Sequence, residues 1–448
     1  MDQSYVLLSA QASLLTPIAR LARTCTHIFA VAYPALYRLC FDFTSQEKFE
    51  KFCDLMATSP RAHLYAREVL AIIAIEQECG VSSQTVRKLA KHDYDDRKFP
   101  RLQELCFGPT GSKRASPITD HALTAILRQC PALSCVQFDN LNSIKGHCFL
   151  RDDANMPVHG LRQLQLRFCD AIPANLFKII AKFAPNLEEL ELTHLYPRHL
   201  EAISKCHKLR LLSVDHIHVG ADEADAFMFL SDVGYIPRIE NICLVDADEL
   251  TTEHVVKMVE KWGPRLKRLA LGAVDGVGDD AIMAVAKSCP NLEFLDIGDL
   301  GIGDEPLIEL IKSCPYLSYL DITYNDLVTD QLLVTLRDHA PQLRVLYASE
   351  AIHLSRHAWV NFVDSAERLQ SFSAGAFWRE RYFRDWVNVA HPEFTRYDPR
   401  ECEWSIEGYE KEMAPASRFD PLTDADRDEE GNDWEDGWMD LGLGGVFF

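Results

Sequence analysis

The chain has 448 residues, of which 47% are hydrophobic and 25% are charged, a composition that is ordinary for globular proteins and ample for a large buried core. The 67 acidic residues outnumber the 46 basic ones, which gives a formal net charge of −21 at pH 7. A charge of this sign opposes phosphate backbones and anionic membrane surfaces, so we expect neither nucleic acid nor a membrane as the main partner.

The start of the chain lacks the features of a secretory signal. The sequence opens Met1-Asp2-Gln3 without a basic region, and polar residues interrupt the apolar ones that follow. No apolar run approaches the roughly 20 residues that a membrane-spanning helix needs. The 14 cysteines are scattered through apolar patterns, which is typical of reduced thiols in a core rather than of disulfides. We therefore expect a cytoplasmic or nuclear protein.

Residues 1–43 precede the regular pattern of the chain and are predicted to be a helical head. The stretch from Leu14 to Phe43 is LLTPIARLARTCTHIFAVAYPALYRLCFDF. It resembles the latter part of a fungal F-box, in which an Ala-Arg-x-Cys helix is followed by a helix that ends in Pro-x-Leu-Tyr-Arg. The resemblance implies that the segment docks a Skp-type adaptor of a cullin ubiquitin ligase. The matching positions that would bind the adaptor are Leu21, Cys25, Phe29, Pro34, Leu36 and Tyr37.

The opening part of an F-box is missing from this segment. The family usually begins with a Leu-Pro-x-Glu segment, and Tyr5 to Ser13 contains no such motif. Two interpretations therefore stay open. The head either docks an adaptor or serves only as a cap over the end of the repeat array that follows, and the two roles are compatible.

Residues 44–100 are predicted to be a helical linker followed by an irregular first repeat. A helix is expected ahead of the break at Ser59-Pro60, because proline cannot continue a helix. The apolar run from Glu68 to Ile75 predicts the first irregular strand.

From residue 101 to residue 375 the pattern L-x-x-L-x-L recurs at intervals of about 26 residues. Copies begin at Leu102, Leu133, Leu161, Leu187, Leu209, Ile239, Leu266, Leu292, Leu317, Leu343 and Leu369. Each copy continues into a turn, a helical run and a proline-containing stop. In the copy that begins at Leu292, Asp304 is predicted to cap the helix and Pro315 to end it.

One such unit cannot be stable alone, since burying each aliphatic side chain contributes about 1.5–3 kcal/mol while ordering each backbone residue costs about 1–2 kcal/mol. Stacked units share one continuous core. These residues resemble the cysteine-containing leucine-rich repeats found in the substrate-binding halves of F-box proteins. The predicted fold is thus an α/β leucine-rich-repeat solenoid, a horseshoe with parallel strands on its concave face, helices on its convex face and an N-terminal helical head.

Side chains alternate along a strand, so the positions between the repeated leucines are predicted to face concave solvent. They carry polar groups in the N-terminal half, namely Glu104, Gln137, Gln163, Gln165, Glu189 and Glu191. The C-terminal half offers Phe294, Asp296, Tyr319, Asp321 and Tyr347, which we predict to bind a partner. The aromatics, expected at one position of consecutive repeats, would serve as anchors, and the carboxylates would favour a basic, partly apolar segment. The alternative is that these positions merely tolerate polar and aromatic side chains.

The repeat ends near Gly375, and two further segments follow. Residues 376–413 are rich in aromatics and are predicted to cap the C-terminal end of the array, with a loop that contacts a bound protein as the alternative. Residues 414–448 are strongly acidic with few aliphatic positions, so we expect disorder there.

No catalytic, cofactor or metal motif stands out. Asp424, Asp426 and Asp428 have the spacing of a calcium loop, but Glu429 occupies the position that needs glycine. We therefore predict no enzyme and no cofactor. The predicted function is the substrate-recognition subunit of a Skp/cullin/F-box-type ubiquitin ligase, which holds a target protein on its concave face; the alternative is an interaction scaffold with no ligase link.

Overall fold

A computed structural model describes the chain over residues 40–42, 46–58, 66–67, 69–74, 81–90, 99–108, 118–141, 144–145, 147–149, 160–167, 169, 180, 184–193, 203, 206–215, 238–245, 247, 250–374, 381–398 and 403–406. The predicted adaptor-binding positions in residues 21–37 and the acidic segment 414–448 lie outside this described part.

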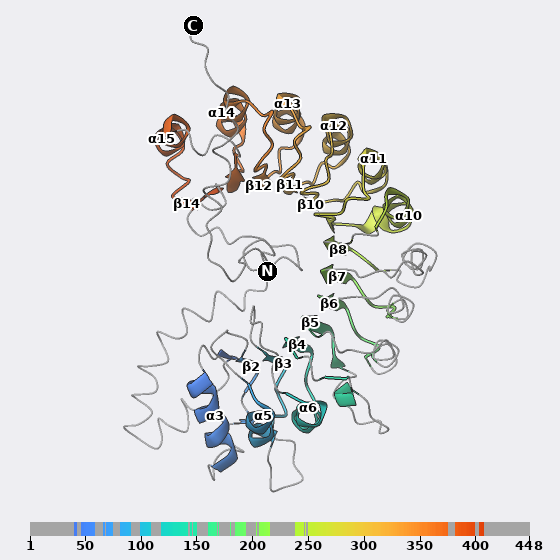
Figure 1. Cartoon of the computed structure of the whole chain (residues 1–448), viewed down its shortest axis with the longest axis vertical. Coiled ribbons are helices and arrows are strands. Elements are labelled where there is room, and N and C mark those ends of the chain that lie inside the picture. The colour runs from blue at the N-terminus through green and yellow to red at the C-terminus, as the bar shows by residue number, and fades with distance from the viewer. Residues whose placement is uncertain are drawn as a thin grey trace, which may run out of the picture.

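The described strands form one sheet that lines the inner side of a horseshoe (Figure 1). In chain order they are β1 (Cys40–Asp42), β2 (Ala71–Ala74), β3 (Glu104–Phe107), β4 (Cys135–Asp139), β5 (Gln163–Arg167), β6 (Glu189–Leu192), β7 (Leu211–Asp215), β8 (Asn241–Val245), β9 (Arg268–Ala270), β10 (Phe294–Asp296), β11 (Tyr319–Asp321), β12 (Val345–Tyr347), β13 (Ser371–Ser373), β14 (Arg396–Asp398) and β15 (Glu403–Ser405). From β1 to β13 each strand pairs in parallel with the next one along the chain. This is a leucine-rich-repeat solenoid, as predicted.

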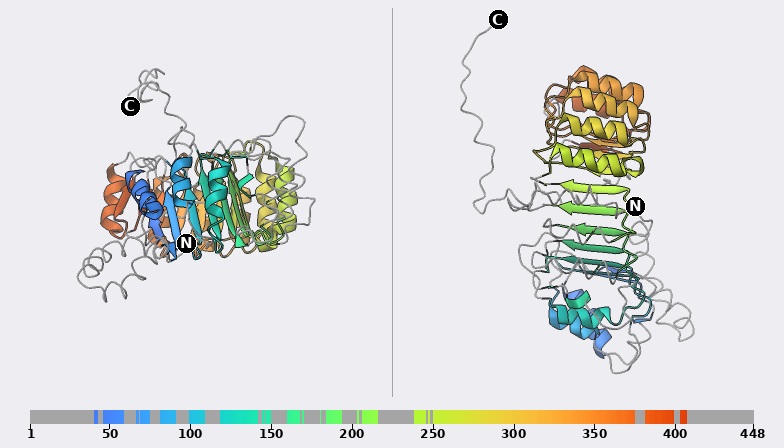
Figure 2. Two further views of the ribbon diagram at one scale, coloured as in Figure 1. Left: turned by 90° about the horizontal axis from the view of Figure 1, so that it is seen from below. Right: turned by 90° about the vertical axis from the view of Figure 1, so that its right-hand side faces the viewer.

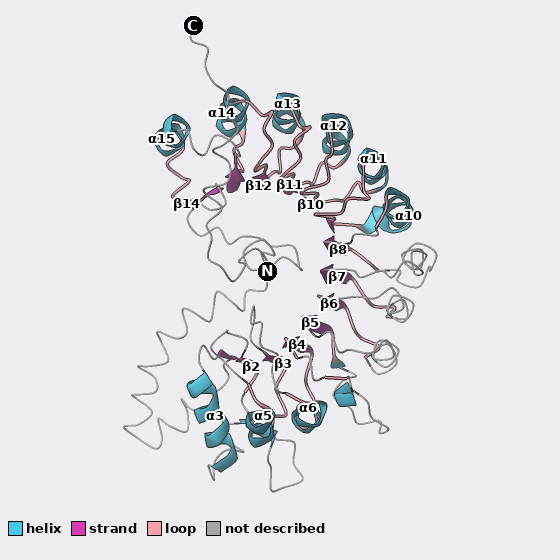
Figure 3. Ribbon diagram, in the orientation of Figure 1, coloured by secondary structure: helices cyan, strands magenta, loops and turns pink. Residues whose placement is uncertain are grey.

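The helices lie on the convex side, one after each strand over much of the array (Figures 2 and 3). They are α3 (Gln46–Thr58), α5 (Ser83–Ala90), α6 (Asp120–Leu127), α10 (Thr252–Trp262), α11 (Asp279–Ser288), α12 (Asp304–Ser313), α13 (Asp330–His339), α14 (Arg356–Ser365) and α15 (Arg381–Ala390), with short 3-10 turns η1 (His147–Phe149) and η4 (Gly263–Arg265). The helix α12 ends two residues before Pro315, which confirms the predicted stop. None of the described helices is long and apolar enough to cross a bilayer.

The array begins ahead of residue 101, where the L-x-x-L-x-L pattern starts, and β2 lies within the irregular first strand predicted from Glu68 to Ile75. β1 and β2 are the first two strands of the same sheet, and α3 and α5 pack against each other on the convex side as the later helices do. The last residues of the predicted helical head, Cys40–Asp42, are therefore a strand. The first two units do not show the L-x-x-L-x-L pattern. Their strands, such as Ala71–Ala74, contain other small and β-branched residues in place of the leucines.

The core lies between the sheet and the helices. The central leucines of successive strands, among them Leu295, Leu320 and Leu346, have no exposed surface. The cysteines at the helix ends are free thiols that fill the same core. Burial raises the pKa of Cys289 and of Cys314 to about 12, and the Cys314 thiol donates to the Cys289 carbonyl oxygen (3.3 Å). These thiols thus act as small buried side chains and not as nucleophiles.

Polar ties join the N-terminal ends of neighbouring helices. Asp304 is the first helical residue of α12, and Gly303 is its cap, so the prediction that Asp304 caps its own helix is wrong. Its carboxylate instead accepts hydrogen bonds from the backbone N–H (2.9 Å) and the hydroxyl of Thr329, the cap of α13. Corresponding ties link Ser83 to Thr119, Thr252 to Gly278, Asp279 to Gly303, and Asp330 to Ser355.

At the C-terminal end, β15 pairs antiparallel with β13, and β14 pairs antiparallel with β15 at the edge of the sheet. Trp404 of β15 stacks on Phe372 of β13 with ring centroids 5.1 Å apart, and Phe383 of α15 meets the same indole at 5.6 Å. All three side chains are buried. The described part of residues 376–413 therefore covers the end of the apolar core.

Replacement of Asp304 by alanine tests the ties between helix ends. Asp304→Ala removes the acceptor for two hydrogen bonds of Thr329, and we expect the free energy of unfolding in urea to fall by about 1–2 kcal/mol. The backbone amide of Thr329 should also exchange faster with deuterium. The matched control is Glu305→Ala, which removes the next, exposed carboxylate of the same helix turn and should change stability by less than about 0.5 kcal/mol. Equal effects of the two variants would contradict the inter-repeat tie.

Candidate protein-binding surface

The strand register sets which side chains face the concave side. Since the central leucines point into the core, the residues on either side of them point into the hollow of the horseshoe. One row across the strands, which we name the first concave row, comprises Glu104, Cys135, Gln163, Glu189, Leu211, Asn241, Arg268, Phe294, Tyr319, Val345 and Ser371. The second concave row comprises Cys106, Gln137, Gln165, Glu191, Ser213, Cys243, Ala270, Asp296, Asp321, Tyr347 and Ser373.

The predicted aromatic residues form a cluster on the concave side. The ring of Phe294 stacks on that of Tyr319 with centroids 3.9 Å apart, and Tyr347 meets Tyr319 edge-on at 5.7 Å. Together with Cys243, Ala270 and Val345 they make a small apolar cluster separate from the main core. Phe294, Tyr319 and Tyr347 are only 3%, 5% and 5% exposed. The expectation that they face solvent is therefore wrong, because the rings use each other as packing partners.

The register also corrects the predicted alignment of these aromatics. Phe294 and Tyr319 are paired in the first row, but Tyr347 pairs with Asp321 in the second row. The residue that follows Tyr319 in the first row is Val345. Tyr347 therefore contacts Tyr319 diagonally, and its hydroxyl lies 3.3 Å from that of Ser371.

Asp296 and Asp321 occupy paired positions of β10 and β11, and both are half-buried. Burial, followed by the negative charge of Asp321, raises the pKa of Asp296 to about 7, while the backbone N–H of Gly298 acts in the opposite direction. A buried pair of carboxylates with like charge is stabilised by a cation placed between them. This point of the concave face therefore favours a positive charge.

A second group of polar side chains spans β4 to β7, and we name it the polar concave cluster. Its members are Gln137, Asp139, Gln165, Arg167, Glu191 and Ser213. Gln165 and Arg167 each donate to Glu191 at 3.0 Å, and Gln137 donates to Asp139 at 3.0 Å. Sequence reasoning named Gln137, Gln165 and Glu191 here and missed the other three, although Asp139 and Arg167 lie only two residues further along their strands.

This cluster holds hydrogen-bond acceptors that no described residue satisfies. One carboxylate oxygen of Asp139, the amide oxygen of Gln165 and the hydroxyl oxygen of Ser213 are buried without such a partner. Burial raises the pKa of Asp139 to about 6, although Arg167 and Gln137 lower it. A buried acceptor without a donor costs about 1–3 kcal/mol, so donors from a bound molecule would be stabilising.

The described part of the chain contains no candidate metal site. No three His, Cys, Asp or Glu side chains of this part of the chain are close enough to share a metal ion. The predicted adaptor-binding residues Leu21, Cys25, Phe29, Pro34, Leu36 and Tyr37 lie outside it, so their role stays a prediction.

No protein-family model matches the chain, and no curated protein matches its sequence. Among solved structures, the chain is similar to Rad7 in a complex of Rad7 and Elc1 from yeast, with 14% identity, a TM-score of 0.45, and coverage of 81% of this chain and 85% of that one. An internalin from Listeria monocytogenes has 14% identity and a TM-score of 0.42 over 75% of this chain and 90% of that one.

The carboxylate of Asp296 should make stability depend on pH. Its pKa is about 7 in the folded chain against 3.8 for the free side chain, so the folded state binds the proton more tightly. Its stabilising contribution is therefore complete below about pH 4 and is lost as the pH rises to 7.

We thus expect Asp296→Asn to have a higher free energy of unfolding than the native chain at a pH of about 8. A pKa raised by one pH unit corresponds to about 1.4 kcal/mol, and the difference should be at least that large. The difference should vanish near pH 4, as followed by urea unfolding. Asp326→Asn, which neutralises an exposed carboxylate in the next loop, should show no such pH dependence. A constant difference between the native chain and Asp296→Asn would contradict the raised pKa.

Proposed function

We propose that the chain is a protein-binding subunit that holds a basic segment of a target protein on its concave face, and that it serves as the substrate receptor of a Skp/cullin/F-box-type ubiquitin ligase. The observation that carries the first part is the set of buried acceptors in the polar concave cluster together with the Asp296–Asp321 pair. Such groups gain most from the N–H donors of lysine and arginine.

The spacing of these two acidic positions indicates how the target would lie. The centre of the polar concave cluster is on β5 and the carboxylate pair is on β10 and β11, with all intervening strands paired. Strands are about 4.8 Å apart, so five to six spacings separate the positions by roughly 24–29 Å. An extended segment of about eight residues covers that distance. We therefore infer that the target presents at least two basic residues about that far apart.

The buried aromatic cluster contributes to this surface mainly through rigidity. The guanidinium carbon of Arg268 lies 4.4 Å from the centre of the Phe294 ring, which extends the stack of Phe294 on Tyr319. A surface that is already ordered loses little entropy on binding. This supports recognition by fixed polar groups on a packed platform.

The ligase part of the proposal rests on the resemblance of residues 14–43 to the latter part of a fungal F-box. β1 begins at Cys40, two residues after Arg38, which ends the matching motif. An adaptor bound to that motif would therefore be joined to the repeat array without a long linker. In this role the chain positions the target, and the partners of the ligase supply the chemistry of ubiquitin transfer.

The second candidate is an interaction scaffold with no ligase link. Residues Tyr5 to Ser13 carry no Leu-Pro-x-Glu motif, and in the family that the head resembles this motif helps to hold the adaptor. The concave surface would work in the same way under either candidate.

Two variants of the full chain separate the two parts of the proposal. In the first, Pro34, Leu36 and Tyr37 are each changed to alanine; in the second, Asp296 and Asp321 are each changed to lysine. We expect the native chain to bind a purified Skp-type adaptor, and the first variant to bind it at least about tenfold more weakly. The second variant should bind the adaptor as the native chain does.

Binding by the intact chain that is equally strong in the first variant would contradict docking through this motif, and no binding by the intact chain would leave the scaffold. A control for folding is the melting temperature of both variants. The Asp275→Lys and Asp326→Lys double variant adds the same charges at exposed loop positions and should bind the adaptor normally.

A further inference from the structure

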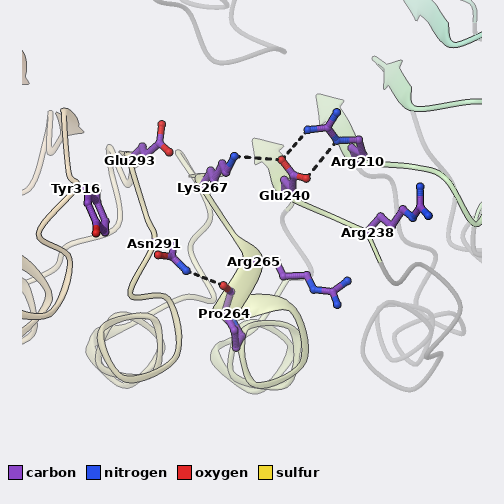
Figure 4. Close-up of a pocket in the computed structure, with 9 residues that line it drawn as sticks. All are labelled: Arg210, Arg238, Glu240, Pro264, Arg265, Lys267, Asn291, Glu293 and Tyr316. Carbon is purple, nitrogen blue, oxygen red and sulfur yellow. Dashed lines mark hydrogen bonds and ion pairs between the residues drawn. The ribbon is translucent and has the colours of Figure 1, made fainter.

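A basic groove lies on the edge of the solenoid at which the parallel strands begin. The residues that line it come from the ends of the convex helices and from the positions just ahead of the strands from β7 to β11 (Figure 4). We name it the basic edge groove; it has a volume of about 700 Å³ and is lined by Arg210, Arg238, Glu240, Pro264, Arg265, Lys267, Asn291, Glu293 and Tyr316.

The groove has an excess of positive charge in a chain whose net charge is −21. Four basic side chains line it against two carboxylates, those of Glu240 and Glu293. Glu240 accepts two hydrogen bonds from Arg210 (3.2 and 2.9 Å) and lies 3.5 Å from Lys267. The hydrogen bonds from Arg210 lower the pKa of Glu240, which therefore stays ionised and holds these two cations at the groove.

One basic side chain of the groove is available to bind another molecule. Arg238 is exposed and forms no hydrogen bond or ion pair with any described residue. Figure 4 shows its guanidinium group on the far side of the groove from Glu293. Tyr316, 58% exposed, offers an aromatic ring at the other end. The groove thus combines positive charge with an accessible aromatic surface, which suits an acidic segment that also carries aromatic residues.

The chain itself contains such a segment. Between Asp420 and Asp440 there are ten carboxylates and one arginine, together with Trp434 and Trp438. These residues hold nearly half of the net negative charge of the protein within 21 positions. No other stretch of the sequence has a comparable density of carboxylates.

The path from the repeat array to this segment starts on the same edge. Ile406, the last described residue, donates its backbone N–H to the carbonyl oxygen of Gln370 (3.0 Å), and Gln370 precedes β13 as Lys267 precedes β9. A second hollow of about 470 Å³ lies beside Ile406, and its charged lining consists of Arg344 and Arg368 together with Glu367 and Glu393. Ile406 therefore lies on the edge of the solenoid that carries the basic edge groove.

The length of chain is sufficient to reach the groove. From β13 to β9 there are four strand spacings, or about 19 Å, and from β13 to β7 six, or about 29 Å. The 14 residues from Ile406 to Asp420 span up to about 46 Å when extended. The first carboxylates can thus arrive at Lys267 and the later ones at Arg210 and Arg238.

We propose that the basic edge groove binds the acidic segment Asp420–Asp440 of the same chain. The contacts are ion pairs between its carboxylates and Arg210, Arg238, Arg265 and Lys267, with a tryptophan of the segment against Tyr316. Attachment to the same chain raises the effective concentration of the segment, so modest ion pairs suffice. This assignment is independent of the proposed concave-face and adaptor interactions.

A photo-cross-linking experiment on the full chain tests the proposal. Tyr316 is replaced by p-benzoylphenylalanine, and cross-linked peptides are mapped by mass spectrometry after irradiation. We expect cross-links to residues 420–440, with a yield independent of protein concentration. Changing Arg238→Glu and Lys267→Glu should lower that yield at least about fivefold, and so should a salt concentration of about 1 M.

The control is the pair Lys51→Glu and Arg356→Glu, which reverses two exposed charges elsewhere on the array and should leave the yield unchanged. Circular dichroism verifies that all variants fold. A loss of cross-links that is equal in the groove variant and the control would overturn the proposal. Absence of cross-links to residues 420–440 in the native chain, or a yield that rises with protein concentration because the segment comes from another copy, would overturn it as well.

Discussion

The constraint on which this structure depends is that each repeat is stable only against its neighbours. The shared apolar core supplies most of the stabilisation, and the parallel backbone ladder from β1 to β13 fixes the lateral register. The ties between helix ends, such as that of Asp304 with Thr329, fix the same register on the convex side. With both sides aligned, side chains from repeats far apart in the sequence form continuous rows on the concave face. The functional surface is a consequence of stacking.

Some side chains of the concave face pack between strands, and we assign binding to others. The aromatic cluster around Tyr319 is almost fully buried by contacts between neighbouring strands. At Asp296 and Asp321, which each accept a backbone N–H of the following loop, neighbouring strands present two carboxylates side by side. Around Asp139 the neighbouring strands offer too few donors, so buried oxygens of Asp139, Gln165 and Ser213 have no partner among the described residues. Native proteins seldom leave such groups unsatisfied, and sites where they do so are candidates for function. This is why we assign recognition to the polar groups.

The sequence pattern predicted the repeat architecture well because the leucine positions and the proline stops are local signals. Leu295 is buried in the core and Pro315 follows the end of α12, as the pattern predicts, and the strands recur with the period of that pattern. The features that it missed depend on contacts between repeats. The tie from Asp304 to Thr329 and the burial of Tyr347 arise only when neighbouring strands are placed in register. The carboxylate oxygen of Asp139 likewise has no partner because the described strands on either side offer it no hydrogen-bond donor.

The most direct test of the central claim is a structure, by cryo-electron microscopy, of the chain bound to a protein that it captures. We expect lysine or arginine side chains of the bound protein to lie within hydrogen-bond distance of the Asp296–Asp321 pair and of the polar concave cluster, and the bound segment to follow the concave rows across the strands between them. A partner seated on the convex helices, or on the concave face with no basic side chain at either position, would contradict it.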